Sequence, residues 1–468
     1  MGGFELSAGV NADKVFLVKH SELEGRLDSY FYQPNFYELD RKLRKNGSVK
    51  FSQLIKSIFN GYDFRDYKEF GTPYIKVANV KQGEFDFRKM QYIEFDSNEI
   101  SKSIQLKKGN LLLTRKGTFG NALSLDQNYD YVISSEVFYI ELNEQIDSKY
   151  LEIFFNSALG QKQFDRNKIG AIMGSLSQEA VKSLQIPLPS LGFQEKIVEF
   201  YKKAYSQKQQ KEQQALALLD SIDGYLLSAL GITLPQQDNR LEKRMFTVPF
   251  SELVGERIDS IYHHDKTVKV ALNNSTYDLV KIKEKCTFLS GYAFSSDDYI
   301  ESLGCFLVTI KNISKNIIDL SNSTFLPTQF YDDYSRFRIQ KDDLVFAMTG
   351  ATIGKVGIFV QDTKALLNQR NGIIRSDKMN TCFLMNLLNT SVYQSLILKN
   401  AVGGAQPNIS ETAITNLLIP LPPFEKQIEI ATHISQIRAA AKQLQEDAAQ
   451  ILTSAKADIE RMILGGIA

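Results

Sequence analysis

Residues 186–189 read Ile-Pro-Leu-Pro, and the same four residues return at positions 419–422. Upstream of each copy stands an aliphatic residue followed by a serine, Leu-Ser at 176–177 and Ile-Ser at 409–410. Both matches are 233 residues apart, since position 187 corresponds to 420 and position 176 to 409. Two matches at one offset indicate a long internal repeat, which has to be recognised before any single motif is interpreted.

The repeat extends toward the N-terminal side of each half, with its blocks in the same order. The sequence Gly-Tyr-x-Phe occurs at 61–64 and 291–294, and Ser-Glu-Leu-x-Gly occurs at 21–25 and 251–255. Further blocks of similar residue type pair 74–80 with 307–313 and 111–117 with 344–350. We therefore predict two related modules, each followed by a long helix. The predicted boundaries are 15–190 for module 1, 191–232 for its helix, 246–423 for module 2 and 424–465 for its helix.

The residue types in each half predict a mixed fold. Each half contains short runs rich in Tyr, Phe, Val and Ile that are broken by Gly and Asn, a pattern typical of strands and turns. Helical patterns follow at 149–157 and 383–396, and a Pro-x-Pro sequence then precedes a long polar helical pattern. The predicted fold class is α+β, with two similar α/β modules separated by two long antiparallel coiled-coil helices and related by a pseudo-two-fold repeat.

The long helical stretches carry apolar residues at alternating spacings of three and four, the a/d pattern of a coiled coil. In the second helix the pattern is formed by Ile430, Ile434, Ile437, Ala441, Leu444, Ala448, Ile451, Ala455 and Met462. In the first helix it is formed by Ile197, Tyr201, Ala204, Ala215, Leu218, Ile222 and Tyr225, with Lys208 and Lys211 interrupting its middle. We predict that residues 193–229 and 424–463 pair with each other in antiparallel orientation. The alternative is that each helix lies on its own module.

Composition limits the class of protein. A chain of 468 residues with 43% hydrophobic and 23% charged residues is typical of a folded protein of two or three domains. The formal net charge is only +1, so any surface for a polyanion must be local. The cysteines are Cys286, Cys305 and Cys382, and this odd, sparse set favours a reducing compartment. Because no apolar stretch reaches the ~18 residues of a membrane span, we expect a cytoplasmic protein.

Two stretches resemble catalytic motifs, but each lacks an essential residue. Residues 350–356 are one residue too short between their glycines for a phosphate-binding loop and end in valine, where Ser or Thr would bind magnesium. Residues 421–424, Leu-Pro-Pro-Phe, lack the Asn or Asp with which amino-methyltransferases accept a hydrogen bond from the target amine. The histidines and carboxylates have no spacing typical of a metal site or a nuclease. We therefore expect no catalytic site, metal or cofactor in this chain.

Local charge beside the paired glycines predicts a surface for DNA. Residues 100–125 contain five cations and no acid, and residues 344–375 contain four cations and one acid. Cations bind backbone phosphates, and amide side chains match the edge of adenine. The predicted DNA-binding residues are Lys76, Asn79, Lys107, Lys108, Arg115, Lys116, Lys311, Asn312, Lys355, Arg370, Gln406 and Asn408. The alternative is that these residues are part of an ordinary solvated surface.

The order of these motifs resembles the specificity (S) subunit of type I restriction–modification systems, over residues 15–464. The resemblance rests on Ser-Glu-Leu-Glu-Gly-Arg-Leu-Asp at 21–28, Leu-Leu-Leu-Thr-Arg-Lys-Gly-Thr-Phe-Gly at 111–120 and Ala-Met-Thr-Gly-Ala-Thr-Ile-Gly at 347–354. It rests also on Ile-Pro-Leu-Pro followed by Gln-Glu-Lys-Ile within 186–197, a run that 419–428 repeats.

This resemblance implies that each module is a target-recognition domain that reads one half of a split site in double-stranded DNA. The helices would set the gap between the half-sites and dock two methyltransferase (M) subunits, which bind S-adenosylmethionine. Restriction (R) subunits would join the complex and cleave DNA with ATP and Mg²⁺, so this chain itself would not be an enzyme. The modules differ most in residues 78–99 and 312–340 and are expected to read different half-sites.

Two other classes of function remain open from the residues alone. One is a coiled-coil scaffold that binds only proteins, which predicts no sequence-dependent retention of DNA. The other is the recognition half of a nuclease or methyltransferase, which predicts that the purified chain modifies or cuts DNA by itself.

Overall fold

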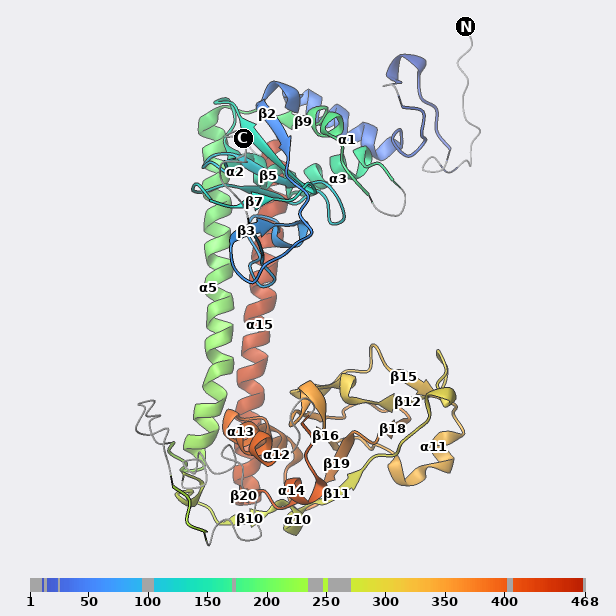
Figure 1. The fold of residues 1–468 in the computed structure, drawn as a ribbon, viewed down its shortest axis with the longest axis vertical. Helices are drawn as coiled ribbons and strands as arrows, with labels where there is room; N and C mark the ends of the chain where they lie inside the picture. Colours follow the sequence, from blue (N-terminus) through green and yellow to red (C-terminus); the bar gives the residue numbers. More distant parts are fainter. Residues whose placement is uncertain are drawn as a thin grey trace. The chain divides into compact units, whose positions relative to one another are not determined.

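The computed structural model describes residues 11, 15–23, 26–94, 105–170, 174–234, 247–250, 271–401 and 407–465. The chain divides into two units, the first formed by residues 1–212 with 446–468 and the second by residues 213–445. Each unit contains one module and part of both long helices (Figure 1). The block at 251–255, the second copy of Ser-Glu-Leu-x-Gly, lies outside the described residues.

Module 1 is built on a four-stranded antiparallel sheet with the strand order β2-β8-β5-β6. A second sheet has the order β4-β3-β7, in which β3 runs antiparallel to β4 and parallel to β7. The remaining strands, β1 and β9, pair antiparallel with each other. The strands are β1 (Ser48–Lys50), β2 (Ile55–Asn60), β3 (Thr72–Ile75), β4 (Gln91–Ile93), β5 (Leu111–Thr114), β6 (Ala122–Ser124), β7 (Val132–Ile133), β8 (Val137–Leu142) and β9 (Gln185–Pro187).

Strand β5 shows why the central strands carry apolar residues on both faces. Alternate side chains of a strand face opposite sides of a sheet. Leu111 and Leu113 pack in the core that the sheet shares with helices, whereas Leu112 faces a second core shared with the β4-β3-β7 sheet. Both faces are therefore buried, and no position alternates to polar. The helices of unit 1 are η1 (His20–Glu22), α1 (Pro34–Lys45), η2 (Phe51–Gln53), η3 (Val77–Asn79), α2 (Ser148–Phe155), α3 (Ala158–Asn167) and α4 (Gln178–Lys182).

Module 2 repeats this plan with a larger main sheet, whose order is β11-β19-β16-β17-β14-β13. A three-stranded sheet β15-β12-β18 and the antiparallel pair β10 and β20 correspond to the smaller sheets of module 1. The strands are β10 (Leu279–Lys281), β11 (Thr287–Ser290), β12 (Cys305–Val308), β13 (Ile313–Ser314), β14 (Asn316–Ile318), β15 (Thr324–Leu326), β16 (Leu344–Ala347), β17 (Val356–Ile358), β18 (Ala365–Leu367), β19 (Asn371–Arg375) and β20 (Leu418–Pro420). The helices are α10 (Ile282–Lys285), η5 (Ser296–Asp298), η6 (Ile310–Asn312), α11 (Phe330–Asp333), η7 (Ser335–Phe337), η8 (Gly350–Thr352), α12 (Thr381–Leu388), α13 (Ser391–Asn400) and α14 (Glu411–Thr415).

The same polar side chains hold the backbone together in both modules. The buried amide of Asn156 donates to the carbonyl of Ala122 at 2.8 Å and accepts from its N–H at 3.0 Å. Asn389, 233 residues later, makes the same two bonds to Val356, at 2.7 and 3.1 Å. Each amide satisfies both backbone groups of a strand residue that lies against a helix end. The internal repeat is therefore confirmed in its hydrogen bonds as well as in its sequence.

A second equivalent pair fixes the start of each long helix. The amide oxygen of Gln194 accepts from the backbone N–H of Asp147 at 2.8 Å, and that of Gln427 accepts from Asn380 at 2.9 Å. Both glutamines are at most 1% exposed. The long helices are α5 (Leu191–Ala229) and α15 (Phe424–Ile463). Each helix is thus attached to its module by a buried hydrogen-bonded side chain in the first turn.

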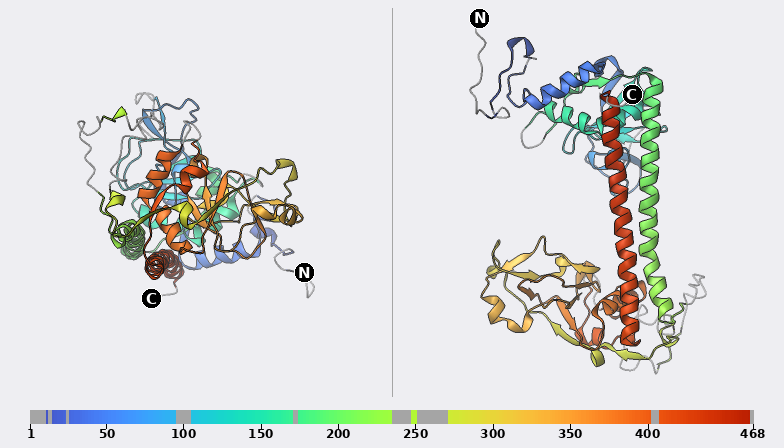
Figure 2. Two further views of the ribbon diagram at one scale, coloured as in Figure 1. Left: turned by 90° about the horizontal axis from the view of Figure 1, so that it is seen from below. Right: turned by 180° about the vertical axis from the view of Figure 1, so that it is seen from behind.

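The two long helices pair with each other, as the heptad pattern predicts, and Figure 2 shows them side by side. In unit 1, Ile197 of α5 shares a core with Ile459 of α15, and in unit 2, Ile222 shares a core with Ile430. Within each unit, the lower residue numbers of one helix meet the higher numbers of the other, so the pair is antiparallel. The same contacts belong to the module cores. The alternative, a helix lying on its own module, is therefore correct only for the start of each helix, because its end packs in the core of the other module.

The polar interruption of the first helix has a partner. The ammonium group of Lys211 lies 2.9 Å from the carboxylate of Asp447 on α15, whereas Lys208 pairs with Glu212 on its own helix. The neighbouring contact positions Ala204, Ala215, Ala441, Ala448 and Ala455 are all buried. Leu218, Ile437, Leu444 and Ile451 are partly exposed, so the alanine row is the more deeply buried edge of the pattern. Small side chains allow two helices to approach closely, and a single cross-helix ion pair can fix their register.

Candidate nucleic-acid interface

In each module, four loop segments meet at one end of the central strands. We call this surface the loop edge. In module 1 it consists of residues 61–63, 115–120, 134–136 and 174–177, and in module 2 of residues 291–293, 348–354, 368–370 and 407–410. Backbone hydrogen bonds join the segments and follow the same scheme in both modules.

The paired glycines form the first of these segments. Gly117 and Gly120 have φ angles of +65° and +87°, and the equivalent Gly350 and Gly354 have +72° and +85°. Side chains other than glycine rarely adopt this left-handed region. The loop begins at Thr114, the last residue of β5, whose hydroxyl donates to the carbonyl of Thr118 at 2.8 Å. These glycines therefore serve a tight turn at the end of a buried strand.

A third glycine in each module lets two segments cross. A Cβ atom on Gly61 would lie 2.0 Å from the carbonyl oxygen of Ile133, and one on Gly291 would lie 2.2 Å from that of Asn368. No side chain fits at this distance. The following residue continues the contact, because the N–H of Ser135 donates to Tyr62 at 3.0 Å and that of Gln369 donates to Tyr292 at 2.9 Å.

The loop edge is closed by the segment before α4 or α14. The N–H of Leu176 donates to the carbonyl of Arg115 at 2.8 Å, and the N–H of Ile409 donates to that of Met348 at 3.0 Å. The serines that follow, Ser177 and Ser410, cap the next helix by accepting from the backbone at its third residue. One end of each module thus presents exposed turns on a rigid frame, an arrangement typical of binding surfaces.

Both modules match one family of known proteins. The family model described as "Type I restriction modification DNA specificity domain" matches residues 50–218 and again residues 274–452. The two matches together cover most of the chain and fall on the two modules. The chain belongs to this family.

Individual relatives agree with this assignment. The chain is 23% identical to the type I restriction enzyme MjaVIII specificity subunit of Methanocaldococcus jannaschii, over 86% of this chain and 91% of that protein. It is 22% identical to the EcoBI specificity subunit of Escherichia coli, over 84% of this chain and 79% of that protein. A chain from a structural study of type I R-M complex assembly and conformational transition matches with a TM-score of 0.57 at 14% identity, over 90% of this chain and 98% of that one. The predicted resemblance and the predicted fold class are confirmed.

The two DNA specificity domains place some of the predicted residues on the loop edge. In module 1, Arg115 and Lys116 lie on it, with Lys116 exposed. In module 2, Arg370 and Asn408 lie on it and are exposed, and Asn408 pairs with Thr349 through a β-bridge. The exposed Lys311 is close to it, because Ile310 of the same turn lies 3.8 Å from the position of a Cβ on Gly350. Gln406 lies outside the described residues.

Two of the predicted base-reading amides are corrected by the structure. Asn79 and Asn312 are each only 3% exposed. Asn79 accepts from the N–H of Lys76 at 3.0 Å and donates to the carbonyl of Asp86 at 2.9 Å. Asn312 accepts from Thr309 at 2.9 Å and donates to Asp319 at 2.9 Å. Their hydrogen-bonding groups are used to shape the turns η3 and η6, so they are not available to a base edge.

The stretch without acids in module 1 is not one surface. Lys107 and Lys108 precede β5, whereas Arg115 and Lys116 follow it, so the two pairs lie at opposite ends of the strand, roughly 20 Å apart. Lys107 and Lys108 are exposed and stay candidates for phosphate contacts elsewhere on module 1. Two further predicted cations are less free. The ammonium group of Lys76 lies over the ring of Tyr67 at 5.1 Å, and Lys355 is half-buried at the start of β17.

The charge of the loop edge is balanced in module 1 and is a single positive charge in module 2. The four segments of module 1 contain the cations Arg115 and Lys116 and the acids Asp63 and Glu136. Those of module 2 contain Arg370 as their single cation and no acid. Phosphate binding alone would favour an excess of cations. A mixture of cationic, acidic and amide tips instead suits the donors and acceptors of base edges.

Aromatic residues beside the loop edge were not among the predicted site residues. Tyr292, 39% exposed, packs against Phe294, Tyr334 and Phe337, with ring centroids 4.8 to 5.3 Å apart. In module 1, Tyr74 donates its hydroxyl to the carbonyl of Tyr62 at 2.6 Å, and burial raises the pKa of Tyr74, which keeps that donor protonated. The repeated Gly-Tyr-x-Phe sequence could have predicted that aromatic residues lie at this surface.

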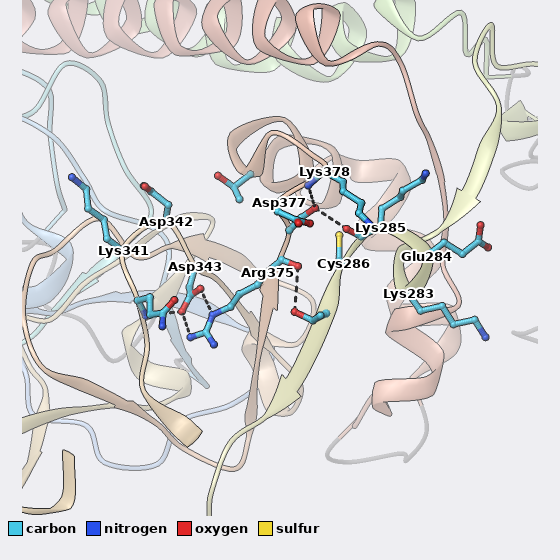
Figure 3. A pocket seen from close by; sticks show the side chains of 14 residues that line it. Lys283, Glu284, Lys285, Cys286, Lys341, Asp342, Asp343, Arg375, Asp377 and Lys378 are labelled. Carbon is cyan, nitrogen blue, oxygen red and sulfur yellow. Dashed lines mark hydrogen bonds and ion pairs between the residues drawn. The ribbon is translucent and has the colours of Figure 1, made fainter. Parts of the chain in front are cut away.

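A polar cavity of unit 2 is separate from this surface. It has a volume of about 560 Å³ and is lined by residues of α10, of the turn before β16 and of the end of β19. Figure 3 shows Asp343 and Arg375 facing each other at its floor, where they form an ion pair of 2.6 Å. Cations and acids alternate on its walls, which gives it no single charge to attract a ligand.

The described residues form neither a cluster of metal ligands nor a membrane-spanning helix. Among the described residues, no group of three His, Cys, Asp or Glu side chains is placed to hold a metal ion. The helices formed by those residues include none long and apolar enough to cross a bilayer.

Proposed function

We propose that this chain is the DNA-reading subunit of a type I restriction–modification complex and that each module contacts one half of a split target through its loop edge. The observation that carries the proposal is the repeated loop edge itself. Both modules build it from the same hydrogen-bonded segments, but with different exposed side chains. A backbone frame that both modules share, with exposed side chains that differ, suits two domains that recognise two different half-sites.

We further propose that the chain supplies recognition and no catalysis. Methyltransferase subunits, two per chain, would dock on the helices and bind S-adenosylmethionine, and restriction subunits would bring ATP and Mg²⁺. The antiparallel helix pair supports a spacer role, because its register is fixed within unit 1 by the Lys211–Asp447 ion pair. The repeated attachments at Gln194 and Gln427 hold each helix on its module in the same way, which fits two equivalent docking sites for two methyltransferase subunits.

The test is to co-express the chain with its methyltransferase subunit and to map methylated bases by single-molecule sequencing, with and without the chain. A split motif that is methylated only when the chain is present is the expected result. A stable complex without chain-dependent methylation would contradict the proposal and favour a protein scaffold. Methylation or cleavage by the purified chain alone would contradict the recognition-only role.

The same assay tests the spacer. Seven residues inserted into the middle of both α5 and α15 keep the heptad phase and lengthen each helix by about 10 Å, or roughly three base pairs of DNA. We expect the gap in the motif to lengthen while both half-sites stay the same. An unchanged gap, with a folded complex, would show that the helices do not set it.

A further inference from the structure

Two positions on the loop edge are paired through the backbone in the same way in both modules. The N–H of Arg115 donates to the carbonyl of Glu136 at 2.9 Å. The N–H of Met348 donates to the carbonyl of Arg370 at 3.0 Å. Residues 115 and 348 both follow the central strand, β5 or β16, and residues 136 and 370 both lie in the turn that leads into β8 or β19. The two pairs are therefore structurally equivalent.

The arginine changes sides between the two pairs. Module 1 carries it at the strand end, as Arg115, and has an acid across from it. Module 2 carries it in the turn, as Arg370, and has methionine across from it. Each module thus has one arginine at this backbone pair. The Cα atom that carries the arginine differs between the modules by the distance between two paired strands, about 5 Å.

Both arginines are available to a ligand. Arg370 is exposed, and Arg115 is half-buried with its guanidinium 5.0 Å from the centre of the Phe138 ring. The Nε of Arg115 is buried without a hydrogen-bond partner, and its Nη1 makes only a long contact of 3.5 Å to the carbonyl of Ser135. Neither arginine forms an ion pair with any of the residues that the structure describes. The Phe138 ring holds the Arg115 side chain in place while its Nε stays without a partner and its Nη1 makes only this long contact.

The chemistry of the guanidinium selects the kind of ligand. Its parallel N–H groups match the O6 and N7 acceptors of guanine in the major groove, the commonest specific arginine contact. In module 1, the acids Asp63 and Glu136 on the same edge argue against a purely phosphate-binding role for Arg115. We propose that Arg115 and Arg370 are specificity-determining residues, each binding a guanine in a different half of the target. The inference rests on the proposed function and adds to it the residue and the base.

The change of side has a consequence for the two half-sites. Because the arginine starts from opposite members of the same backbone pair, it reaches a different base step in each half-site, even when the two modules dock in the same way. The residue left opposite also differs. Glu136 can accept from the amino group of cytosine, whereas Met348, 9% exposed, offers only an apolar contact.

The test uses the full complex of this chain with its methyltransferase subunits and compares Arg115→Gln, Arg370→Gln and the control Arg44→Gln. Arg44 lies on α1, away from the loop edge, and pairs with Asp40. For each variant, methylation is measured at the wild-type motif and at all sites that differ from it by one base. We expect Arg115→Gln to reduce discrimination at one G·C pair of one half-site by about 10- to 100-fold. Arg370→Gln should do the same in the other half-site, and Arg44→Gln should change neither.

A paired replacement sharpens the result. Arg115→Met with Glu136→Arg gives module 1 the arrangement of module 2, and we expect its guanine preference to move to another position of the same half-site. The thermal unfolding of each variant is compared with that of the wild type. If changes at the half-buried Arg115 reduce stability, the variant of the exposed Arg370 still tests the inference.

The outcomes separate this inference from the proposed function. If the wild-type chain gives no chain-dependent split motif, the proposed function itself fails. If it gives the motif but Arg115→Gln and Arg370→Gln leave every base preference unchanged, the arginines are not specificity residues. A uniform loss of methylation at all sites, or both variants altering the same half-site, would also overturn the inference.

Discussion

The two modules share a backbone but fill it with side chains from different strands. In module 1, Leu113 of β5 lies opposite Phe138 of β8, and in module 2, Phe346 of β16 lies opposite Gly372 of β19. The missing ring is supplied by Phe288 of β11, whose ring lies 2.0 Å from where a Cβ on Gly372 would be. The core therefore conserves the volume that has to be filled rather than the residue that fills it.

A second difference is electrostatic. Module 2 buries Asp343, 4% exposed, against Arg375, whose Nε lies 2.6 Å from the carboxylate (Figure 3). Module 1 has Asn110 and Glu141 at the equivalent positions, which form no ion pair with each other: Asn110 accepts from the N–H of Leu142 at 3.3 Å, and Glu141 accepts from the hydroxyl of Ser57 at 2.6 Å. The same sheet is thus formed with and without an ion pair at this place, and the comparison shows that the ion pair is not required by the fold.

The largest expected effect comes from breaking that ion pair on one side. Asp343→Asn leaves the guanidinium of Arg375 partly buried without its carboxylate, and we expect unit 2 to lose about 3 kcal/mol of unfolding free energy. The double variant Asp343→Asn with Arg375→Leu removes both charges and should recover most of the loss. Urea unfolding of the three proteins measures both changes. A double variant as unstable as the single one would show that Arg375 is needed for packing and not only for charge.

The next effect should be equal in the two modules. Asn156→Ala and Asn389→Ala each leave a buried backbone N–H without a partner, so we expect each to cost about 2 kcal/mol. Thermal unfolding of the two variants makes the comparison, with Asn11→Ala as the exposed control. Markedly unequal losses would mean that the two hydrogen-bonded pairs, although equivalent in geometry, differ in their surroundings.

The smallest effect concerns an acid that only module 1 contains. Glu152, 1% exposed, pairs with Lys149 at 2.6 Å and accepts from the N–H of Ser124 at 2.8 Å, and the equivalent residue in module 2 is Met385. Burial raises the pKa of Glu152 above its ordinary 4.5. The folded state therefore holds this proton more tightly than the unfolded state, and stability falls as the pH rises from 4.5 through the raised pKa.

Glu152→Gln should remove this pH dependence. At pH 8 we expect the variant to be as stable as the wild type or up to about 1 kcal/mol more stable, because no charge has to be buried. Urea midpoints between pH 4 and pH 8 test this, with the exposed Glu144→Gln as control. A variant that is less stable than the wild type at every pH would show that the Lys149 ion pair outweighs the cost of burial.

The repeat and the coiled-coil pattern could be read from the sequence because both depend on spacing along the chain. The offset of 233 residues and the heptad rows predicted two modules and an antiparallel pair of helices. The predicted DNA-binding residues fared less well for a physical reason. An amide that caps a buried turn and an amide that reads a base are the same residue type, and only burial separates Asn79 from Asn408.

By itself, the sequence determined the family, the duplication and the pairing of the long helices, because these follow from local order and hydrophobic period. Only the tertiary structure decided which residues share a surface. It separated Lys107 from Arg115 at the two ends of one strand and brought Gly61, Arg115, Glu136 and Leu176 to a single edge. Strand pairing between residues far apart in the chain makes such neighbours, and no pattern within one segment records them.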